Sequence, residues 1–311
     1  MKNIYKPHYN KQDINEILKF YDPPTTSSQD IIGQRTYCIS KNNQNNKYIF
    51  EKKLNDGSSC VIHLGKNKDN NEKVVIKEIS KRHNWRKELN ILKKLSESET
   101  GRILKYIDYF ETHMNSYIVT KYYEGYDLFE HIDINVPYPE KEAYELFNEM
   151  CQCIKECHDN NIVHLDIKCE NYMVKKENLF PIKQGNLILI DFGHSEKIKE
   201  NTDIDDIQIG SEHGTKYYLS PEGYDKVYSS KSDIWSLGIC FCLLITGDYP
   251  YSGSEREYMW NAINSNIKLR GNISKRSKMI IELCLKPDPR ERPTINQLIN
   301  FVSASNNNNN K

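Results

Sequence analysis

Two carboxylates, a lysine and an amide lie close together in the middle of the sequence. Asp166, Lys168 and Asn171 fall within one short stretch, and Asp191 follows twenty residues after Asn171. The apolar run 187–190, just before Asp191, predicts a short strand. An asparagine and an aspartate at the roots of paired strands would present the hard oxygen ligands that Mg²⁺ prefers. Asp166 would then be free to orient a hydroxyl nucleophile or take its proton, and Lys168 would offset charge on a transferred phosphoryl group.

Each of these residues also has a plainer interpretation. A lone aspartate on a loop is usually a turn former or a helix cap, and a lone lysine is usually solvated. The catalytic hypothesis therefore depends on the spaced set rather than on any one member.

The segment 164–171, followed by Asp191-Phe192-Gly193, resembles the catalytic loop and the metal-binding loop of eukaryotic-type protein kinases. The resemblance covers about residues 48 to 301. It implies an α+β fold with two lobes, a small β-rich N-lobe with one main helix and a larger α-helical C-lobe. It also implies ATP and Mg²⁺ as cofactors, and Asp166 as the residue that orients the substrate hydroxyl and accepts its proton.

A strand that ends in a lysine lies upstream. Val74-Val75-Ile76-Lys77 matches the family's Val-Ala-Ile-Lys, and a lysine on an inward strand face needs a counter-charge because a buried unpaired ammonium is costly. Glu88 is the candidate partner, on a helix predicted by the apolar spacing of residues 85–95. The short separation of Lys77 and Glu88 indicates a helix without its first turn. The alternative is that Glu88 is a solvated helix residue.

The segment Leu54 to Ile62 lines up with the family's glycine-rich loop, whose backbone N–H groups cover the ATP phosphates. Only Gly57 of the three glycines is present, because Asn55 and Cys60 occupy the other two positions. Asparagine tolerates a left-handed backbone better than most residues, whereas Cys60 has neither the freedom nor the small size of glycine. Without the resemblance, the segment 54–62 would be interpreted as an ordinary hairpin.

The segment after Thr120, the gatekeeper position, would join the two lobes. The backbones of Lys121 and Tyr123 would bond the adenine edge, and Asp127 would reach the ribose hydroxyls. The residues that the resemblance implies for ATP binding are Leu54, Asn55, Asp56, Gly57, Ser58, Ser59, Cys60, Val61, Ile62, Val75, Lys77, Thr120, Lys121, Tyr123, Asp127 and Met173. The catalytic residues that the resemblance implies are Asp166, Lys168, Lys77, Glu88 and Thr215, and the metal ligands that it implies are Asn171 and Asp191.

The segment Gly214 to Glu222 resembles the end of a kinase activation segment. Thr215 matches the residue that bonds the catalytic aspartate and lysine in serine/threonine kinases, so serine/threonine specificity is favoured. Leu165 replaces the arginine that precedes the catalytic aspartate in many family members and pairs with a phosphate on this segment. Ser211 stands where that phosphate usually sits, but neither it nor the acidic stretch 203–206 can pair with a leucine. We therefore expect activity without phosphorylation, or control by another route.

Other elements are predicted to hold these loops in place. Ser232 begins an almost wholly apolar helix that Gly247 ends, and a helix that is apolar all round is buried at a domain centre. The resemblance implies that Asp233 braces the catalytic-loop backbone. It also implies that Glu222 pairs with Arg292, and breaking such a buried pair costs about 3–5 kcal/mol.

Composition excludes several classes of function. The chain has 43 basic and 43 acidic side chains, so no net field favours nucleic acid or an acidic membrane as a partner. The N-terminus has no signal-peptide core, and the longest clean apolar run, 237–245, is too short to span a bilayer. We expect a soluble cytoplasmic protein, located in the host cytoplasm if its source is a virus.

Nine cysteines in a chain without an export signal are expected to be reduced. Cys151, Cys153, Cys157 and His158 suggest a metal site, but they lie in the helix predicted to begin at Pro139, where Cys151 and Cys153 point to different sides. We favour small buried hydrophobes and keep a metal site as the alternative.

The domain prediction has three parts. Residues 1–47 form a polar extension that either docks on the domain or is disordered. The kinase domain spans 48–301, with an N-lobe of about 48–122 and a C-lobe of about 123–301, and an Asn-rich disordered tail, 302–311, follows. Such Asn- and Lys-rich tracts are typical of AT-rich genomes, as in some protists and giant viruses.

Two other functions remain open. A pseudokinase that acts as a binding or scaffold module is suggested by the degraded glycine loop and by Leu165, although all the catalytic residues named above are present. A small-molecule phosphotransferase of related fold is disfavoured, because residues 214–222 and the helix from Ser232 resemble a platform for protein substrates. The expected partner is a protein, with basic residues near the acceptor if Glu170 and Asp127 act as in kinases that prefer such substrates. The oligomeric state is not predicted.

Overall fold

The computed structural model describes residues 47–56, 60–135, 137–176, 183–210 and 214–303, which belong to one structural unit beginning at Asn42. Several predictions fall outside the described residues: the extension 1–46, the tail from 304, residues 177–182 of the connector 175–186, and Gly57, Ser58, Ser59, Ser211 and Glu212.

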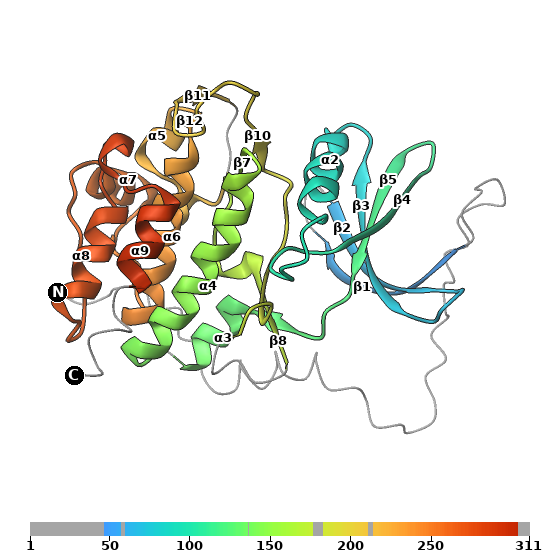
Figure 1. Ribbon diagram of the computed structural model, residues 1–311, viewed down its shortest axis with the longest axis horizontal. Coiled ribbons are helices and arrows are strands. Elements are labelled where there is room, and N and C mark those ends of the chain that lie inside the picture. The colour runs from blue at the N-terminus through green and yellow to red at the C-terminus, as the bar shows by residue number, and fades with distance from the viewer. Residues whose placement is uncertain (1–46, 57–59, 136, 177–182, 211–213, 304–311) are drawn as a thin grey trace. The chain divides into compact units, whose positions relative to one another are not determined.

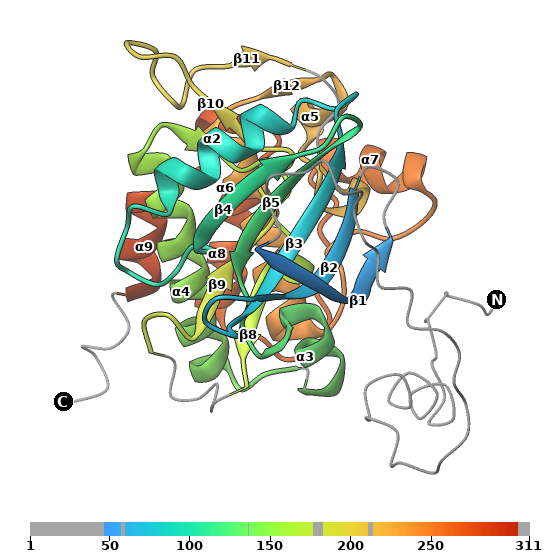
Figure 2. The same ribbon diagram turned by 90° about the vertical axis from the view of Figure 1, so that its right-hand side faces the viewer.

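A five-stranded antiparallel sheet forms the first part of the described chain (Figures 1 and 2). Its strands are β1 (Tyr48–Asp56), β2 (Cys60–Asn67), β3 (Lys73–Ser80), β4 (Tyr106–Glu111) and β5 (Asn115–Lys121), in the order β1-β2-β3-β5-β4. Strand β3 alternates, so Val74 and Ile76 are buried on one face and Lys77 lies on the other. Helix α2 (Trp85–Leu95) packs its apolar residues in the same cluster as Ile79 and Ile118 of the sheet. This face therefore directs Lys77 toward α2.

Helices dominate the rest of the described chain (Figure 1). They are α3 (Leu128–Asn135), α4 (Glu140–Asp159), α5 (Pro221–Tyr224), α6 (Ser230–Thr246), α7 (Glu255–Ile263), α8 (Lys275–Cys284) and α9 (Ile295–Ser303), with 3-10 turns η1 (Cys169–Asn171), η2 (Lys216–Tyr218) and η3 (Pro289–Glu291). The short strands are β6 (Gly125–Asp127), β7 (Ile162–Val163), β8 (Tyr172–Lys175), β9 (Leu187–Leu189), β10 (Glu196–Lys197), β11 (Gln208–Ile209) and β12 (Val227–Tyr228). The α+β prediction, with a β-rich N-lobe and a helical C-lobe, is confirmed.

Helix α6 is the buried centre of the C-lobe. It packs against α4 and α8, and nearly all its side chains are buried, as its apolar sequence predicts. Ser229 and Ser232 form a capping box at its start, and Gly247 ends it with a φ of 71°. Within the described residues, no helix combines the length and the apolarity needed to cross a membrane.

The cysteines of α4 belong to the hydrophobic core. Cys151, Cys153 and Cys157 are all 0% exposed and lie in the main cluster of buried residues. Burial raises the pKa of the Cys153 thiol well above its ordinary value, which disfavours the thiolate that metals bind. In the described part of the chain, no group of three or more His, Cys, Asp or Glu is placed to hold a metal ion.

Candidate active site

A buried aspartate on α6 holds the backbone of the loop that precedes Asp166. Both carboxylate oxygens of Asp233 accept backbone hydrogen bonds, from His164 N–H at 2.9 Å and from Leu165 N–H at 2.8 Å. The ring of His158, on α4, lies 2.9 Å from the same carboxylate. Leu165 has a φ of 65°, which is unfavourable for a residue with a bulky side chain. Asp233 therefore stabilises a strained turn at the site.

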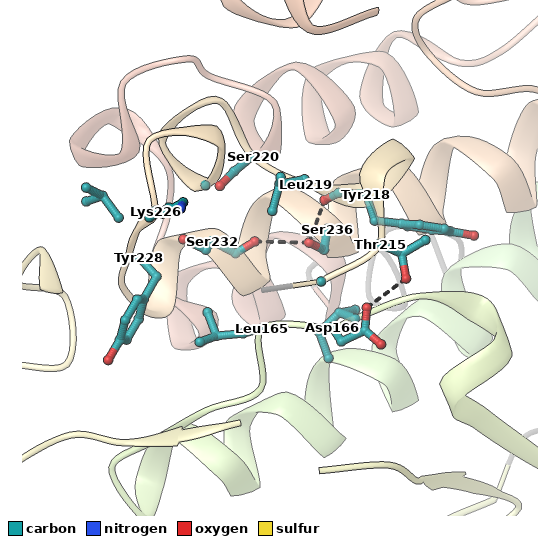
Figure 3. Close-up of a pocket in the computed structure, with 14 residues that line it drawn as sticks. Leu165, Asp166, Thr215, Tyr218, Leu219, Ser220, Lys226, Tyr228, Ser232 and Ser236 are labelled. Atoms are coloured by element: carbon teal, nitrogen blue, oxygen red, sulfur yellow. Dashed lines mark hydrogen bonds between the residues drawn. The ribbon is translucent and has the colours of Figure 1, made fainter. Parts of the chain in front are cut away.

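The carboxylate of Asp166 is enclosed by three polar side chains. Thr215 Oγ1 donates to Asp166 Oδ1 at 2.8 Å, a bond that Figure 3 shows between the loop and the activation segment. Lys168 Nζ lies 3.0 Å from Asp166 Oδ2 and donates to Thr215 Oγ1 at 2.8 Å. Asn171 Nδ2 donates to Asp166 Oδ2 at 3.1 Å. These contacts fix the carboxylate next to a cation, an arrangement that suits positioning a hydroxyl and accepting its proton.

Lys77 makes two short ion pairs. Its ammonium lies 2.7 Å from Glu88 Oε1 and 2.8 Å from Asp191 Oδ1. Burial alone would lower the pKa of Lys77, but the two carboxylates outweigh burial and raise this pKa above its ordinary value. Burial raises the pKa of Glu88 against the opposing effect of Lys77. Glu88 is 7% exposed, so the alternative of a solvated helix residue is wrong.

Gly193 lies close to the Asp191 carboxylate in the turn that follows it. Asp191 has a φ of 59°, and Gly193 N–H donates to Asp191 Oδ1 at 3.2 Å. A Cβ on Gly193 would lie 3.3 Å from Asp191 Oδ1 and 3.5 Å from Lys77 Nζ. Burial alone would raise the pKa of Asp191, but the Lys77 ammonium and this N–H hold that pKa well below its ordinary value.

Asn171 lies directly before β8, and Asp191 lies two residues after the end of β9, the strand that pairs with β8. Ile190 N–H donates to the Asn171 carbonyl at 2.8 Å, which brings the two strand roots together. Asn171 Nδ2 donates to the Asp166 carbonyl at 2.7 Å, and this bond orients the amide with Oδ1 at its other end. An amide oxygen and an ionised carboxylate suit a hard divalent cation, whose remaining ligands are commonly water and phosphate. The two residues therefore fit such an ion.

The residues expected around the nucleotide base come from both lobes. Val75 and Thr120 are paired neighbours in β3 and β5, and Asp127 and Met173 are paired neighbours in β6 and β8. Thr120 is 4% exposed, so little of it is accessible to a ligand. The small sheet β6-β8-β9 thus connects Asp127 and Met173, which are expected near the base, to the strand ends beside Asn171 and Asp191.

Lys121 and Tyr123 lie in and just after the end of β5, in the connection to the C-lobe. Lys121 N–H donates to the Lys105 carbonyl at 2.9 Å, so the backbone of Lys121 offers a ligand its carbonyl oxygen and not its N–H. Tyr123 is half-buried, and burial raises its pKa above the ordinary value.

The glycine-rich loop is described only at its two sides. Asn55 pairs with Ile62, and Asp56 pairs with Val61, so β1 and β2 remain paired up to the last described residue of β1. Leu54 is 46% exposed. Cys60 is partly buried against the main core cluster, so the sheet continues up to the position where the family has its third glycine.

Leu165 faces an apolar cluster on the activation-segment side. It forms a buried group with Val163 and Ile198, against which Ile204 and Tyr228 pack. Figure 3 shows Leu165 and Tyr228 among the side chains around a small cavity that also borders Asp166. The stretch 203–206 meets this cluster through the apolar side chain of Ile204.

Three ion pairs near the site were not predicted. They are Lys87 with Glu196 at 2.7 Å, Arg102 with Glu149 at 3.1 Å, and Lys231 with Asp205 at 3.3 Å. Each joins residues far apart in the sequence, and no periodic pattern links the partners. The helix was predicted to begin at Ser232, which left Lys231 outside it, whereas α6 begins at Ser230 and takes Lys231 into its buried first turn.

Comparison with known proteins agrees with this geometry. The family model described as "Protein kinase domain" matches residues 48–302. The chain is 29% identical over 263 residues to a probable serine/threonine-protein kinase MARK-C of Dictyostelium discoideum, covering 81% of this chain and 32% of that protein. It is 29% identical over 265 residues to the serine/threonine-protein kinase Nek1 of Mus musculus, covering 81% and 21%. It is 27% identical over 257 residues to a CDPK-related protein kinase of Daucus carota, covering 78% of this chain and 41% of that protein. The chain thus matches less than half the length of each of these relatives.

Proposed function

The chain belongs to the protein kinase family, and from that premise we propose that it is an active serine/threonine kinase, which transfers the γ-phosphoryl group of ATP to hydroxyl groups of proteins. It would be of the type without an arginine before the catalytic aspartate, because Leu165 stands there. The observation that carries the proposal is the hydrogen-bonded set of Asp166, Lys168 and Thr215. A module that only binds would have no use for a buried carboxylate oriented by a lysine and a hydroxyl.

Each residue of the site then has a role. Asp166 orients the substrate hydroxyl and accepts its proton, and Lys168 offsets the negative charge of the transferred group. Thr215 holds these two side chains in register. Lys77, whose charge the Glu88 pair favours, binds the α and β phosphates of ATP.

The family implies ATP and a divalent cation in general, and we assign Mg²⁺ to Asn171 and Asp191. The ion, when bound, neutralises charge on the phosphates. The chain contributes an amide oxygen fixed by the Asn171–Asp166 bond and a carboxylate that Lys77 keeps ionised.

The domain boundaries that we propose are 48–122 for the N-lobe and 123–301 for the C-lobe, with residues 1–47 as an extension and 302–311 as a tail. The family match to residues 48–302 supports the outer limits of the kinase domain. Helix α9 ends at Ser303 and Val302 is 4% exposed, so the last helix extends two residues beyond the proposed C-lobe limit.

Protein substrates with basic residues near the acceptor are proposed from Glu170 and Asp127. Burial raises the pKa of both carboxyl groups, and Tyr218 Oη donates to Glu170 at 3.3 Å. A basic substrate side chain would offset the cost of burying these carboxylates. A peptide with arginine before its serine should therefore be phosphorylated faster than its alanine counterpart. Equal rates for the two peptides would contradict this preference.

A pseudokinase is the second candidate, and Asn55 and Cys60 in place of glycines favour it. The two functions are separated by incubating the protein with ATP, a divalent cation and a generic basic protein, with Lys77→Met as the inactive control. Transfer by the wild type that the control lacks supports the kinase. Nucleotide binding without transfer would support the binding module.

A further inference from the structure

We propose that Asp205 is a positioning residue, which pairs with Lys231 and holds the activation segment in place without a phosphate. The inference deepens the proposed kinase function and rests on it. It assigns to a genetically encoded carboxylate the ordering role that a phosphate plays elsewhere.

Lys231, in the first turn of α6, requires a counter-charge. It is 7% exposed, and its ammonium lies 3.3 Å from Asp205 Oδ2 and donates to the Arg292 carbonyl at 3.1 Å. Asp205 is the one acid that pairs with Lys231 among the described residues. Its other oxygen accepts a hydrogen bond from the Ser230 hydroxyl. Without Asp205, a nearly buried ammonium would keep only a neutral partner.

Backbone bonds around Asp205 attach the same stretch to the C-lobe. Ser230 N–H donates to the Ile204 carbonyl at 3.0 Å, and Gly210 N–H donates to the Lys226 carbonyl at 2.9 Å. Between these two bonds, β11 pairs with β12 in an antiparallel ladder. The Asp205 carboxylate therefore lies at one end of a continuous set of backbone bonds that joins residues 204–210 to residues 226–230.

The first turn of α6 also connects Asp205 to the far end of the activation segment. Arg292 Nη1 donates to the Lys231 carbonyl at 3.0 Å and to Glu222 Oε1 at 2.7 Å. The chain between Asp205 and Glu222 is thus fixed at both ends on one support. Thr215 lies between these ends, and a loop with fixed ends has fewer conformations to lose when Thr215 bonds Asp166.

Close packing beneath the segment agrees with this support. The cavity between the catalytic loop and the segment has a volume of ≈ 20 Å³, which is room for about one water molecule. Its lining includes Leu165, Thr215 and Tyr228 (Figure 3). The activation segment is therefore held at two separate places, by apolar contacts with Leu165 and by the ion pair of Asp205 with Lys231.

The test compares Asp205→Asn with Asp206→Asn in the full chain after phosphatase treatment. Asp206 is the matched control because it is exposed and its side chain makes no hydrogen bond or ion pair with the described residues. Hydrogen exchange is followed at the Ser230 and Gly210 amides, together with kcat and the KM for ATP. We expect Asp205→Asn alone to speed exchange at both amides and to lower kcat about tenfold or more, with KM for ATP changed less than about twofold. Unchanged exchange, or equal effects of the two variants, would overturn the proposal.

Two further variants separate positioning from general stability. Asp205→Glu should restore most of kcat because it keeps the charge. Lys231→Met should give a loss similar to that of Asp205→Asn, and the double variant should be no worse than either single one, because both remove the same pair. Additive losses would contradict the pairing. Hydrogen exchange decides the role of Asp205 even if the wild type transfers no phosphate, a result that would refute the proposed function instead.

Discussion

Arg292 donates to both carboxylate oxygens of Glu222, at 2.7 and 2.8 Å, from a side chain that is 0% exposed. Its other N–H groups donate to three backbone carbonyls. The guanidinium also lies over the Trp235 ring, 4.9 Å from the ring centroid. All five donors of Arg292 are therefore used, as the burial of this charge requires.

Replacing Glu222 by glutamine should destabilise the protein by about 3–5 kcal/mol, because it leaves the buried guanidinium without a counter-charge. Urea unfolding of wild type and variant measures the difference. Arg290→Lys is the matched control, since Arg290 pairs with Asp288 at an exposed position, with 84% of its side chain accessible, and should leave the midpoint nearly unchanged. A similar loss of stability in both variants would show that the buried pair contributes no more to stability than the exposed one.

Stability should fall in acid because of Glu222 and Asp191. Burial would raise both pKa values, but Arg292 lowers that of Glu222 below its ordinary 4.5, and Lys77 lowers that of Asp191 below its ordinary 3.8. A group with a depressed folded-state pKa adds stability above its unfolded-state value, and this stability is lost as the pH falls through the folded-state value. Between about pH 6 and pH 3, the wild type should therefore lose more free energy of unfolding than Glu222→Gln does, because only the wild type loses the contribution of the Glu222 carboxylate. Equal slopes would contradict the assigned shift of Glu222.

Thr215→Ala should lower kcat by about 10- to 100-fold, the effect expected from losing hydrogen bonds to charged groups. Thr215→Ser keeps the hydroxyl that bonds Asp166 and Lys168, so it should retain most of the activity. Steady-state rates on one peptide test both variants. Loss in the serine variant equal to that in the alanine variant would show that the hydroxyl is not what matters.

Cys60→Gly should modestly raise ATP affinity or turnover, because close approach of backbone to phosphate favours a residue without Cβ. Nucleotide titration and initial rates would measure this change. A clear loss of activity would mean that the loop uses another geometry and that its alignment to the family loop should be rejected.

The catalytic set is predictable from the sequence because it depends on local spacing. Asn171 and Asp191 were predicted from their positions beside short apolar runs. Lys77 was predicted at the end of a strand, whereas β3 continues to Ser80 and places Lys77 in its interior. The identity of Glu88 as its partner also follows, since the apolar spacing of α2 decides which side of the helix faces the sheet. The kinase fold itself was predicted from the same residues.

The attachment of the activation segment was not predictable in this way. Asp205 and Lys231 meet only because the chain returns to the first turn of α6, and nothing in the acidic stretch distinguishes Asp205 from Asp206. The apolar surroundings of Leu165 likewise depend on packing by Ile198 and Tyr228. Contacts of this kind depend on tertiary structure, which local patterns do not encode.

The most direct test of the account is phosphate transfer from labelled ATP to a protein substrate by wild type and Asp166→Asn, with nucleotide affinity measured for both. Asparagine keeps the size of the side chain but cannot accept the proton. If Asp166 accepts the proton, the wild type should give a signal and the rate of the variant should fall by about 10²- to 10⁴-fold, with ATP affinity nearly unchanged. Transfer by Asp166→Asn at the wild-type rate would contradict this role of Asp166.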